Sequence, residues 1–407
     1  MDDPSKEEGP RVLKVLEALK QASHELQAHP RQDFDEPNSS AIKALLELET
    51  ESDTILSKDP NLSILSQHLT SLKNLVETFQ KCRGHLSIRS FLTRRVSTHS
   101  ISRVAGSIEN EIQAWIDRES VENLTWVLRE PGNDKEEETV RLLTQFEDRL
   151  AEGFNRELQD LILKSKVFLL LESTLCDLDS SKRIREHAAF AIGALIRFNK
   201  DVFVGQVLMG PTTRALITMA SPHSIKVLCF LIRSIKSPLV DVIESNGEIP
   251  RIIAFLNCQD VQVRVMAMDC ILEIGYFGRK EAIDAMLEEG LIKKLVELQR
   301  SELGGDLIEL GRYSSKNENE KENREVSADG VELGKKRRES RERRFLESHP
   351  FASCVARFAV QLEVGEGLRQ RERRAFKQQI VVRVREASAS DAEAATIVAE
   401  VLWGASP

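Results

Sequence analysis

The sequence predicts an all-α protein, with an N-terminal four-helix-type bundle followed by an α-solenoid. Two observations support this fold class. Apolar residues recur at spacings of three and four along most of the chain, which is the spacing of one helix face. A helical pattern also repeats about every 40 residues between Ile184 and Gln299. A chain of 407 residues is too long for one compact core, whereas a solenoid grows in one dimension.

The repeated pattern is an amphipathic helix whose apolar stripe occurs three times. Its corresponding anchors are Leu195, Ile235 and Leu272, which lie 40 and 37 residues apart. The full stripes are Ile184, Ala188, Ala191 and Leu195, then Leu228, Leu231 and Ile235, then Val265, Met268 and Leu272. Leu150 precedes Leu195 by 45 residues, which predicts one earlier, degenerate copy.

Glycine and proline residues predict where these helices end and begin. Gly247 and Gly290 each precede an apolar helix start, and each can adopt the left-handed conformation that ends a helix. Pro250 fits only near the start of a helix. A period of about 40 residues is typical of armadillo and HEAT solenoids. The stretch resembles armadillo repeats, and we expect the solenoid over residues 129–301, with a terminal repeat and cap helices over residues 348–407.

The N-terminal region predicts the bundle. After a disordered start at residues 1–9, apolar stripes mark four helices within residues 10–128. This region resembles the helical domain that precedes the U-box in plant U-box/armadillo ubiquitin ligases, which is similar to the bundle of the mixed-lineage kinase-like pseudokinase. The resemblance rests on the helix pattern and on the segment LKNLVETFQKCRGHLS. Only the short joint REPGNDKEEE stands where a U-box would be needed, so ligase activity is not implied.

Residues 83–103 predict a basic linker between the third and fourth bundle helices. The segment contains five arginines, namely Arg83, Arg89, Arg94, Arg95 and Arg103. One interpretation is a surface for anionic lipids or acidic partners. A second is phosphorylation at Ser97, which follows Arg94 and Arg95 closely. The third is a solvated loop without a role.

Residues 302–347 predict a disordered, charged insertion, because they contain few large apolar residues and no periodicity. The run Lys335, Lys336, Arg337 and Arg338 is a candidate nuclear localisation signal, although nearby glutamates dilute its charge. The acidic start of the chain argues against a secretory signal, and no apolar run is long enough to span a membrane. We therefore expect a cytoplasmic protein, with nuclear import as the alternative.

The sequence contains no motif typical of catalysis or cofactor binding. We find no phosphate-binding glycine loop, nucleophile elbow, zinc-protease motif or kinase signature. The six cysteines form no CxxC pair and the histidines do not complete a metal site, so we expect free thiols, no metal and no cofactor. The net charge of −8 argues against nucleic acid as the main partner. We therefore expect that the chain is not an enzyme.

The armadillo resemblance allows one binding mode to be tested. Armadillo importers that read nuclear localisation peptides carry Trp and Asn four residues apart on successive inner helices. The anchor alignment places Phe190 and Ala194, Phe230 and Ser234, and Ala267 and Ile271 at these positions, so that ladder is absent. Phe190 and Phe230 are candidate apolar anchors in a protein-binding groove, with Arg197, Arg233 and Arg264 supplying charge. The alternative is that both rings pack inside the solenoid.

These observations favour a non-catalytic intracellular scaffold or adaptor whose partners are other proteins, with no small-molecule substrate. Two alternatives stay open. One is an accessory or regulatory component of a ubiquitin ligase pathway without its own U-box. The other is a membrane-associated signalling protein that uses the basic linker at residues 83–103.

Overall fold

The computed structural model describes residues 20–21, 65, 67–71, 74–75, 88–130, 136–305 and 344–403. Within these ranges the regular structure is helical and no strand occurs, which confirms the all-α prediction. The chain divides into two compact units, residues 1–130 with 155–167, and residues 131–154 with 168–407. The predicted N-terminal disorder, most of the first three bundle helices, most of the insertion and its basic run Lys335–Arg338 lie outside the described residues.

The described part of the first unit is built on α4 (Ile88–Arg129) and α6 (Arg156–Lys164), which pack against each other. The stripe predicted for the fourth bundle helix is fully buried at Ala105, Ile108 and Ile112. Leu65 and Leu69, from the predicted third helix, are also buried. Asn155 begins α6, because its side-chain oxygen accepts a hydrogen bond from the backbone N–H of Leu158.

The linker predicted at residues 83–103 is wrong from Ile88 onward, because α4 is continuous from Ile88 to Arg129. Ser97 therefore lies inside a helix and not in a loop. No proline or glycine occurs between His85 and Ala105. Serine, threonine and arginine lower helix propensity by only a few tenths of a kcal/mol each, which is too little to end a helix without such a breaker.

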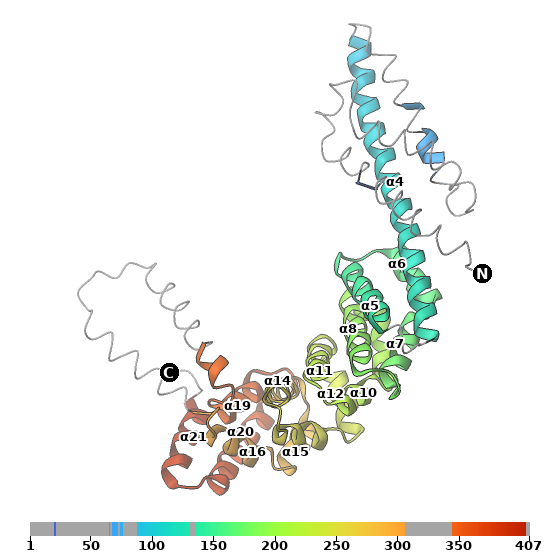
Figure 1. Cartoon of the computed structure of the whole chain (residues 1–407). Helices are drawn as coiled ribbons and strands as arrows, with labels where there is room; N and C mark the ends of the chain where they lie inside the picture. Colours follow the sequence, from blue (N-terminus) through green and yellow to red (C-terminus); the bar gives the residue numbers. More distant parts are fainter. Residues whose placement is uncertain are drawn as a thin grey trace. The chain divides into compact units, whose positions relative to one another are not determined.

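The second unit is a solenoid of stacked helices (Figure 1). It begins with α5 (Glu136–Ala151), α7 (Val167–Cys176) and α8 (Lys182–Phe198). Two three-helix repeats follow, α9 (Lys200–Met209), α10 (Thr212–Met219) and α11 (Pro222–Ile235), then α12 (Ser237–Ser245), α13 (Ile249–Ala254) and α14 (Val261–Phe277). A short 3₁₀ turn, η4 (Phe255–Asn257), extends α13.

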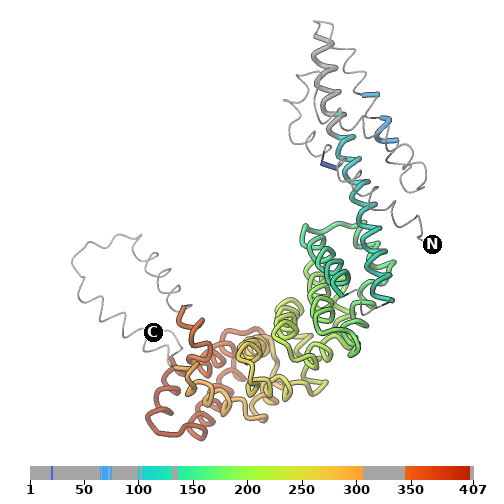
Figure 2. Tube along the Cα trace, viewed as in Figure 1, coloured from blue at the N-terminus to red at the C-terminus, as the bar shows by residue number. Residues whose placement is uncertain are grey.

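The last part of the solenoid contains the insertion. The third repeat consists of α15 (Lys280–Glu288), α16 (Leu291–Arg300) and α19 (Cys354–Val364), and the insertion lies between α16 and α19. The helices α20 (Gln370–Ala387) and α21 (Asp391–Trp403) close the unit. The tube in Figure 2 shows the repeats following one another along the unit in chain order. This packing confirms the predicted armadillo-like solenoid.

The helices α5, α8, α11, α14 and α19 form one row, in which each packs against the next. We call this set the inner row, because it lies on the inner side of the bend of the second unit in Figure 1. The packing is close at Gly275 of α14, where a Cβ atom would lie 3.0 Å from the Phe358 ring of α19. The inner row therefore connects all the repeats through an unbroken series of helix–helix contacts.

The predicted helix ends are confirmed by the backbone. Gly247 and Gly290 have φ angles of +68° and +77°, the left-handed conformation expected of them. Pro250 lies in the first turn of α13. Ser221 begins α11 with a capping box, in which its hydroxyl accepts from the N–H of Ser224 while the Ser224 hydroxyl accepts from the N–H of Ser221.

The phase of the predicted stripes needs correction in the third copy. Leu195 is fully buried as expected, but Val265 and Leu272 are only half-buried. The N-cap residues of α8, α11 and α14 are Ser181, Ser221 and Asp260, so corresponding positions lie 40 and 39 residues apart. The counterpart of Leu195 on α14 is therefore the fully buried Ile274 and not Leu272, so the third stripe lies two residues later than predicted.

The chain closes the base of the insertion with hydrogen bonds. The N–H of Phe351 donates to the carbonyl of Leu303 at 3.1 Å, and the N–H of Ser353 donates to the carbonyl of Gly305 at 2.9 Å. The Ser353 hydroxyl and the Gln299 amide (3.0 Å) both donate to the carboxylate of Glu400, which is fully buried. Segments before and after the insertion, and the last helix, are thereby tied together.

The substitution Leu195→Asp tests whether Leu195 of α8 is buried in the core of the second unit. The new carboxylate would lie unpaired in the core, so we expect a loss of several kcal/mol and cooperative unfolding of the second unit at lower temperature. Circular dichroism melting measures the effect. The matched control is Lys200→Asp, an exposed position on α9. An unchanged melting temperature for Leu195→Asp would refute the placement of this residue.

Cleavage inside residues 306–343 tests the closure of the insertion. A protease site placed there should give two fragments that stay associated, because α19 packs on α14 and α16, and α20 packs on α16. Gel filtration of the cut protein under native conditions measures association, and a denaturant run provides the control. Separate elution of the fragments without denaturant would contradict the expectation.

Candidate functional site

The exposed face of the inner row is the most extended candidate surface of the second unit. Its side chains follow helical spacing, because residues three and four apart lie on one face. On α8 they are Arg183, Glu186, His187, Phe190, Ala194 and Arg197, and on α11 they are His223, Lys226, Phe230, Arg233 and Ser234. On α14 they are Val265, Met266, Asp269, Leu272, Glu273 and Tyr276. We call this surface the row face.

Aromatic and acidic groups meet where α5, α8 and α11 pack together. The Phe190 ring has its centroid 6.1 Å from that of His187 and 5.6 Å from that of His223, both with edge-to-face geometry. The Nδ1 atom of His223 lies 3.1 Å from a carboxylate oxygen of Glu186. Phe190 is therefore half-buried, between two imidazoles, and its remaining exposed surface is held in one position.

Glu147 of α5 contacts His187 of α8 at the same place. Their Oε1 and Nδ1 atoms are 3.7 Å apart, and neither atom has a hydrogen-bond partner among the described residues. Burial raises the pKa of Glu147 to about 7, with a further contribution from Asp148, while Arg197 opposes the shift. Burial also lowers the pKa of His187. Both groups are thus displaced toward their neutral forms, and the contact is not a strong ion pair.

A stacked cation covers the next aromatic ring along the row. The guanidinium carbon of Arg197 lies 5.0 Å from the centroid of the Phe230 ring, so an α8 cation rests on an α11 ring. Phe230 remains half-buried and Arg197 remains exposed. The ring and the guanidinium together form a combined apolar and cationic spot.

An acidic pair occupies the row face of α14. Asp269 and Glu273 lie one helical turn apart, and Nε of Arg233 on α11 lies 3.3 Å from Glu273. Burial raises the pKa of Asp269, against the opposing charges of Arg357 and Arg233. Burial likewise raises the pKa of Glu273, against Arg233. Arginines from both neighbouring helices therefore compensate two partly desolvated carboxylates.

The structure brings together only part of the predicted groove. Phe190, Ala194, Arg197, Phe230, Arg233 and Ser234 all lie on the row face. Ala267 and Ile271 are fully buried, so a partner on the row face cannot contact them. Arg264 is half-buried, with its guanidinium 5.7 Å from the centroid of the Phe351 ring. The anchor alignment failed here because it placed the end of α14 two residues too early.

Sequence reasoning missed Glu147, His187, His223, Asp269 and Glu273. With the helix starts aligned, Phe190 and Ala194 correspond on α14 to Asp269 and Glu273. The N-cap residues Ser181, Ser221 and Asp260 mark these helix starts and would have located that acidic pair. Nothing local to the sequence signals the contact between Glu147 and His187, which are 40 residues apart.

The described cysteines are free thiols, of which Cys229, Cys270 and Cys354 are buried and Cys176 and Cys258 are half-buried. Burial raises the pKa of Cys354 to about 12, so its thiol stays protonated. No group of three or more metal-ligating side chains occurs in the described part of the chain. No helix among the described residues is long and apolar enough to cross a membrane.

Comparisons with known proteins give structural similarities only. No protein-family model matches the chain, and no curated protein matches it. Among solved structures, a designed armadillo repeat protein is 15% identical, with 69% of this chain and 98% of that one covered and a TM-score of 0.39. An engineered protein is 13% identical, with 70% and 96% covered and a TM-score of 0.42.

A third solved structure, a designed armadillo repeat protein in complex with the peptide (KR)4, is 16% identical, with 69% of this chain and 98% of that one covered and a TM-score of 0.38.

Glu147→Gln tests the electrostatics of the row face. A raised folded-state pKa means that Glu147 favours folding fully below about pH 4.5, and this contribution is lost as the pH rises through about 7. The neutral glutamine avoids that loss, so the stability of the variant relative to wild type should increase between pH 5 and pH 8. We expect about 1 kcal/mol after discounting for partial exposure.

Urea denaturation at the two pH values measures this difference. Glu138→Gln, at an exposed position on the same helix, is the control and should show no such change. A stability difference between Glu147→Gln and wild type that is the same at both pH values would rule out the proposed desolvation.

Proposed function

We propose that this chain is a non-catalytic scaffold that binds other proteins through the row face. The observation that carries the proposal is the row face itself, a continuous surface contributed by successive repeats. Stacked repeats are suited to binding extended segments, because each repeat adds a similar strip of surface. The row face presents half-exposed aromatic rings beside cations, the residue types that dominate binding energy at protein interfaces.

The chemistry of the row face favours contact through side chains. Phe190 and Phe230 offer apolar contact, and Lys226 is an exposed cation on the α11 face between His223 and Phe230. Asp269 and Glu273 offer carboxylates that are already partly neutralised by Arg233. The positions that carry Trp and Asn in the importers are different here, so a partner backbone cannot be held by that ladder.

The two alternatives taken from the sequence have no specific support. No described residue favours a role in a ubiquitin ligase pathway. Residues 88–103, on which the membrane alternative relied, form the first part of α4. The scaffold proposal is therefore the one that the described surface supports best.

Photo-crosslinking tests this proposal directly. A photoreactive amino acid replaces Lys226 on the row face or, in a matched variant, Lys280 on α15, where the side chain is also exposed. After irradiation in cells, we expect protein adducts from position 226 and few from position 280, because only the first lies in the binding surface. Mass spectrometry identifies the adducts.

Charge reversal then checks that the adducts reflect binding. The partner protein identified from the adducts is purified, and its affinity for the chain is measured. We expect Lys226→Glu to weaken this binding at least tenfold, and Lys280→Glu to weaken it less than twofold. Both residues are exposed, so neither change should lower the melting temperature. Equal adducts from both positions, or no loss with Lys226→Glu, would refute binding through the row face.

A further inference from the structure

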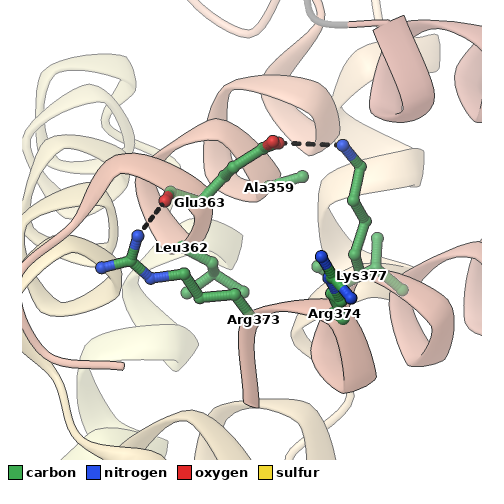
Figure 3. Close-up of a pocket in the computed structure, with 7 residues that line it drawn as sticks. Ala359, Leu362, Glu363, Arg373, Arg374 and Lys377 are labelled. Atoms are coloured by element: carbon green, nitrogen blue, oxygen red, sulfur yellow. Dashed lines mark hydrogen bonds and ion pairs between the residues drawn. The ribbon is translucent and has the colours of Figure 1, made fainter. Parts of the chain in front are cut away.

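A small pocket of about 50 Å³ opens between α19, the last helix of the inner row, and α20 (Figure 3). Its floor is apolar and consists of Ala359, Leu362 and Ile380, each at most 4% exposed. Such a floor offers dispersion contacts but no polar partner. Its small volume matches one or two methyl groups and not an aromatic ring.

The rim of this pocket is cationic. Arg373, Arg374 and Lys377 of α20 line it, against the single carboxylate of Glu363 on α19. The imbalance continues along the helix, since α20 carries six basic and two acidic residues in a chain of net charge −8. The cations are therefore concentrated at this place and do not reflect the composition of the chain.

Arg373 holds the pocket in shape. Its Nε donates to the carbonyl of Leu368 at 3.0 Å, and its Nη atoms donate to the carbonyls of Glu363 at 2.8 Å and Gly365 at 2.6 Å. These carbonyls end α19 and continue into the following turn, where a cation is favourable. Arg373 thus forms one side of the pocket (Figure 3). Each of its three guanidinium nitrogens already donates a hydrogen bond within the protein.

The other two cations are available to a ligand. Lys377 donates to the carboxylate of Glu363 at 2.8 Å and to the carbonyl of Leu402 at 3.4 Å, but the ion pair is partly exposed and exchanges its partner at little cost. Arg374 is exposed, and no hydrogen bond or ion pair engages it within the described part of the chain. A guanidinium with free donors can take a carboxylate in a bidentate manner.

We propose that this pocket binds an acidic peptide segment of a partner protein that carries one small apolar side chain. The apolar side chain would contact the floor, and carboxylates on either side of it would pair with Arg374 and Lys377. Charge complementarity and the size of the floor both select this chemistry. The proposal rests on the proposed function, because α19 belongs to the inner row.

A fluorescence-anisotropy titration of the full chain tests the pocket. The probe is a fluorescein-labelled nonapeptide with a central valine and four glutamates on each side. We expect Arg374→Glu to weaken binding at least tenfold, because it reverses a charge that faces the ligand. The matched control, Arg385→Glu, reverses an exposed charge three turns further along α20 and should weaken binding less than twofold.

A second pair of changes tests the floor. Replacing the central valine of the probe by glycine should weaken binding about fivefold. Ala359→Val fills the pocket, so it should weaken the valine probe to the level of the glycine probe and leave the glycine probe unchanged. Thermal melting of each variant confirms that it is folded, and if Ala359→Val does not fold, the comparison of the two probes on wild type decides the point.

Four results would overturn the proposal. Equal binding of the valine and glycine probes, or an equal loss with Arg385→Glu, would show general attraction of anions to α20. Equal binding of a single-stranded RNA of the same charge would show a nucleic-acid surface. If the peptide does not bind while the Lys226-dependent adducts persist, only the proposal for this pocket is refuted. If neither the peptide nor the adducts are found, the scaffold proposal is refuted as well.

Discussion

Each helix of the inner row must bury its apolar residues, and it does so against the next helix of the row and against the outer helices, such as α9, α10 and α13. This constraint determines the rest of the second unit. Leu195, Ile235 and Ile274 lie at corresponding places on α8, α11 and α14, and all three are buried. Because a helix has a limited circumference, burying one face leaves another exposed. The row face is therefore a direct consequence of how the solenoid holds together.

The same constraint explains how the solenoid accommodates an insertion between α16 and α19. The helix α19 covers the exposed side of α14, and its Phe358 ring packs against Gly275. The chain must therefore return to the row after the insertion. The hydrogen bonds from Phe351 to Leu303 and from Ser353 to Gly305 hold the two ends of the insertion together. Because Glu400 accepts from Gln299 and Ser353, the last helix fixes this junction from a third direction.

Features that depend on local sequence could be predicted, and those that depend on contacts between distant residues could not. The all-α class, the left-handed Gly247 and Gly290, and the buried stripe of Ala188, Ala191 and Leu195 follow from periodicity and backbone preferences. The length of α4 differs from the prediction because serines and arginines are common in loops but do not end a helix without a breaker. The predicted α14 groove positions are wrong because the third stripe lies two residues later than predicted, and a shift of two residues turns a helical side chain from the surface to the core. The compensation of Asp269 by Arg233 and Arg357 involves three helices, so no single stripe reveals it.

The charges on the row face and the adjoining Glu147 of α5 are costly to the fold. Burial raises the pKa values of Glu147, Asp269 and Glu273, so the folded state disfavours the ionised form of each carboxylate. Apolar side chains of similar volume would pack at these half-buried positions without that penalty. Solenoid stability is supplied by the opposite, buried faces of the same helices, so stability does not require carboxylates on the row face. Arg233 and Arg357 offset part of this cost at Asp269, and binding of a partner through the row face, as proposed above, would give these charges a role that folding does not.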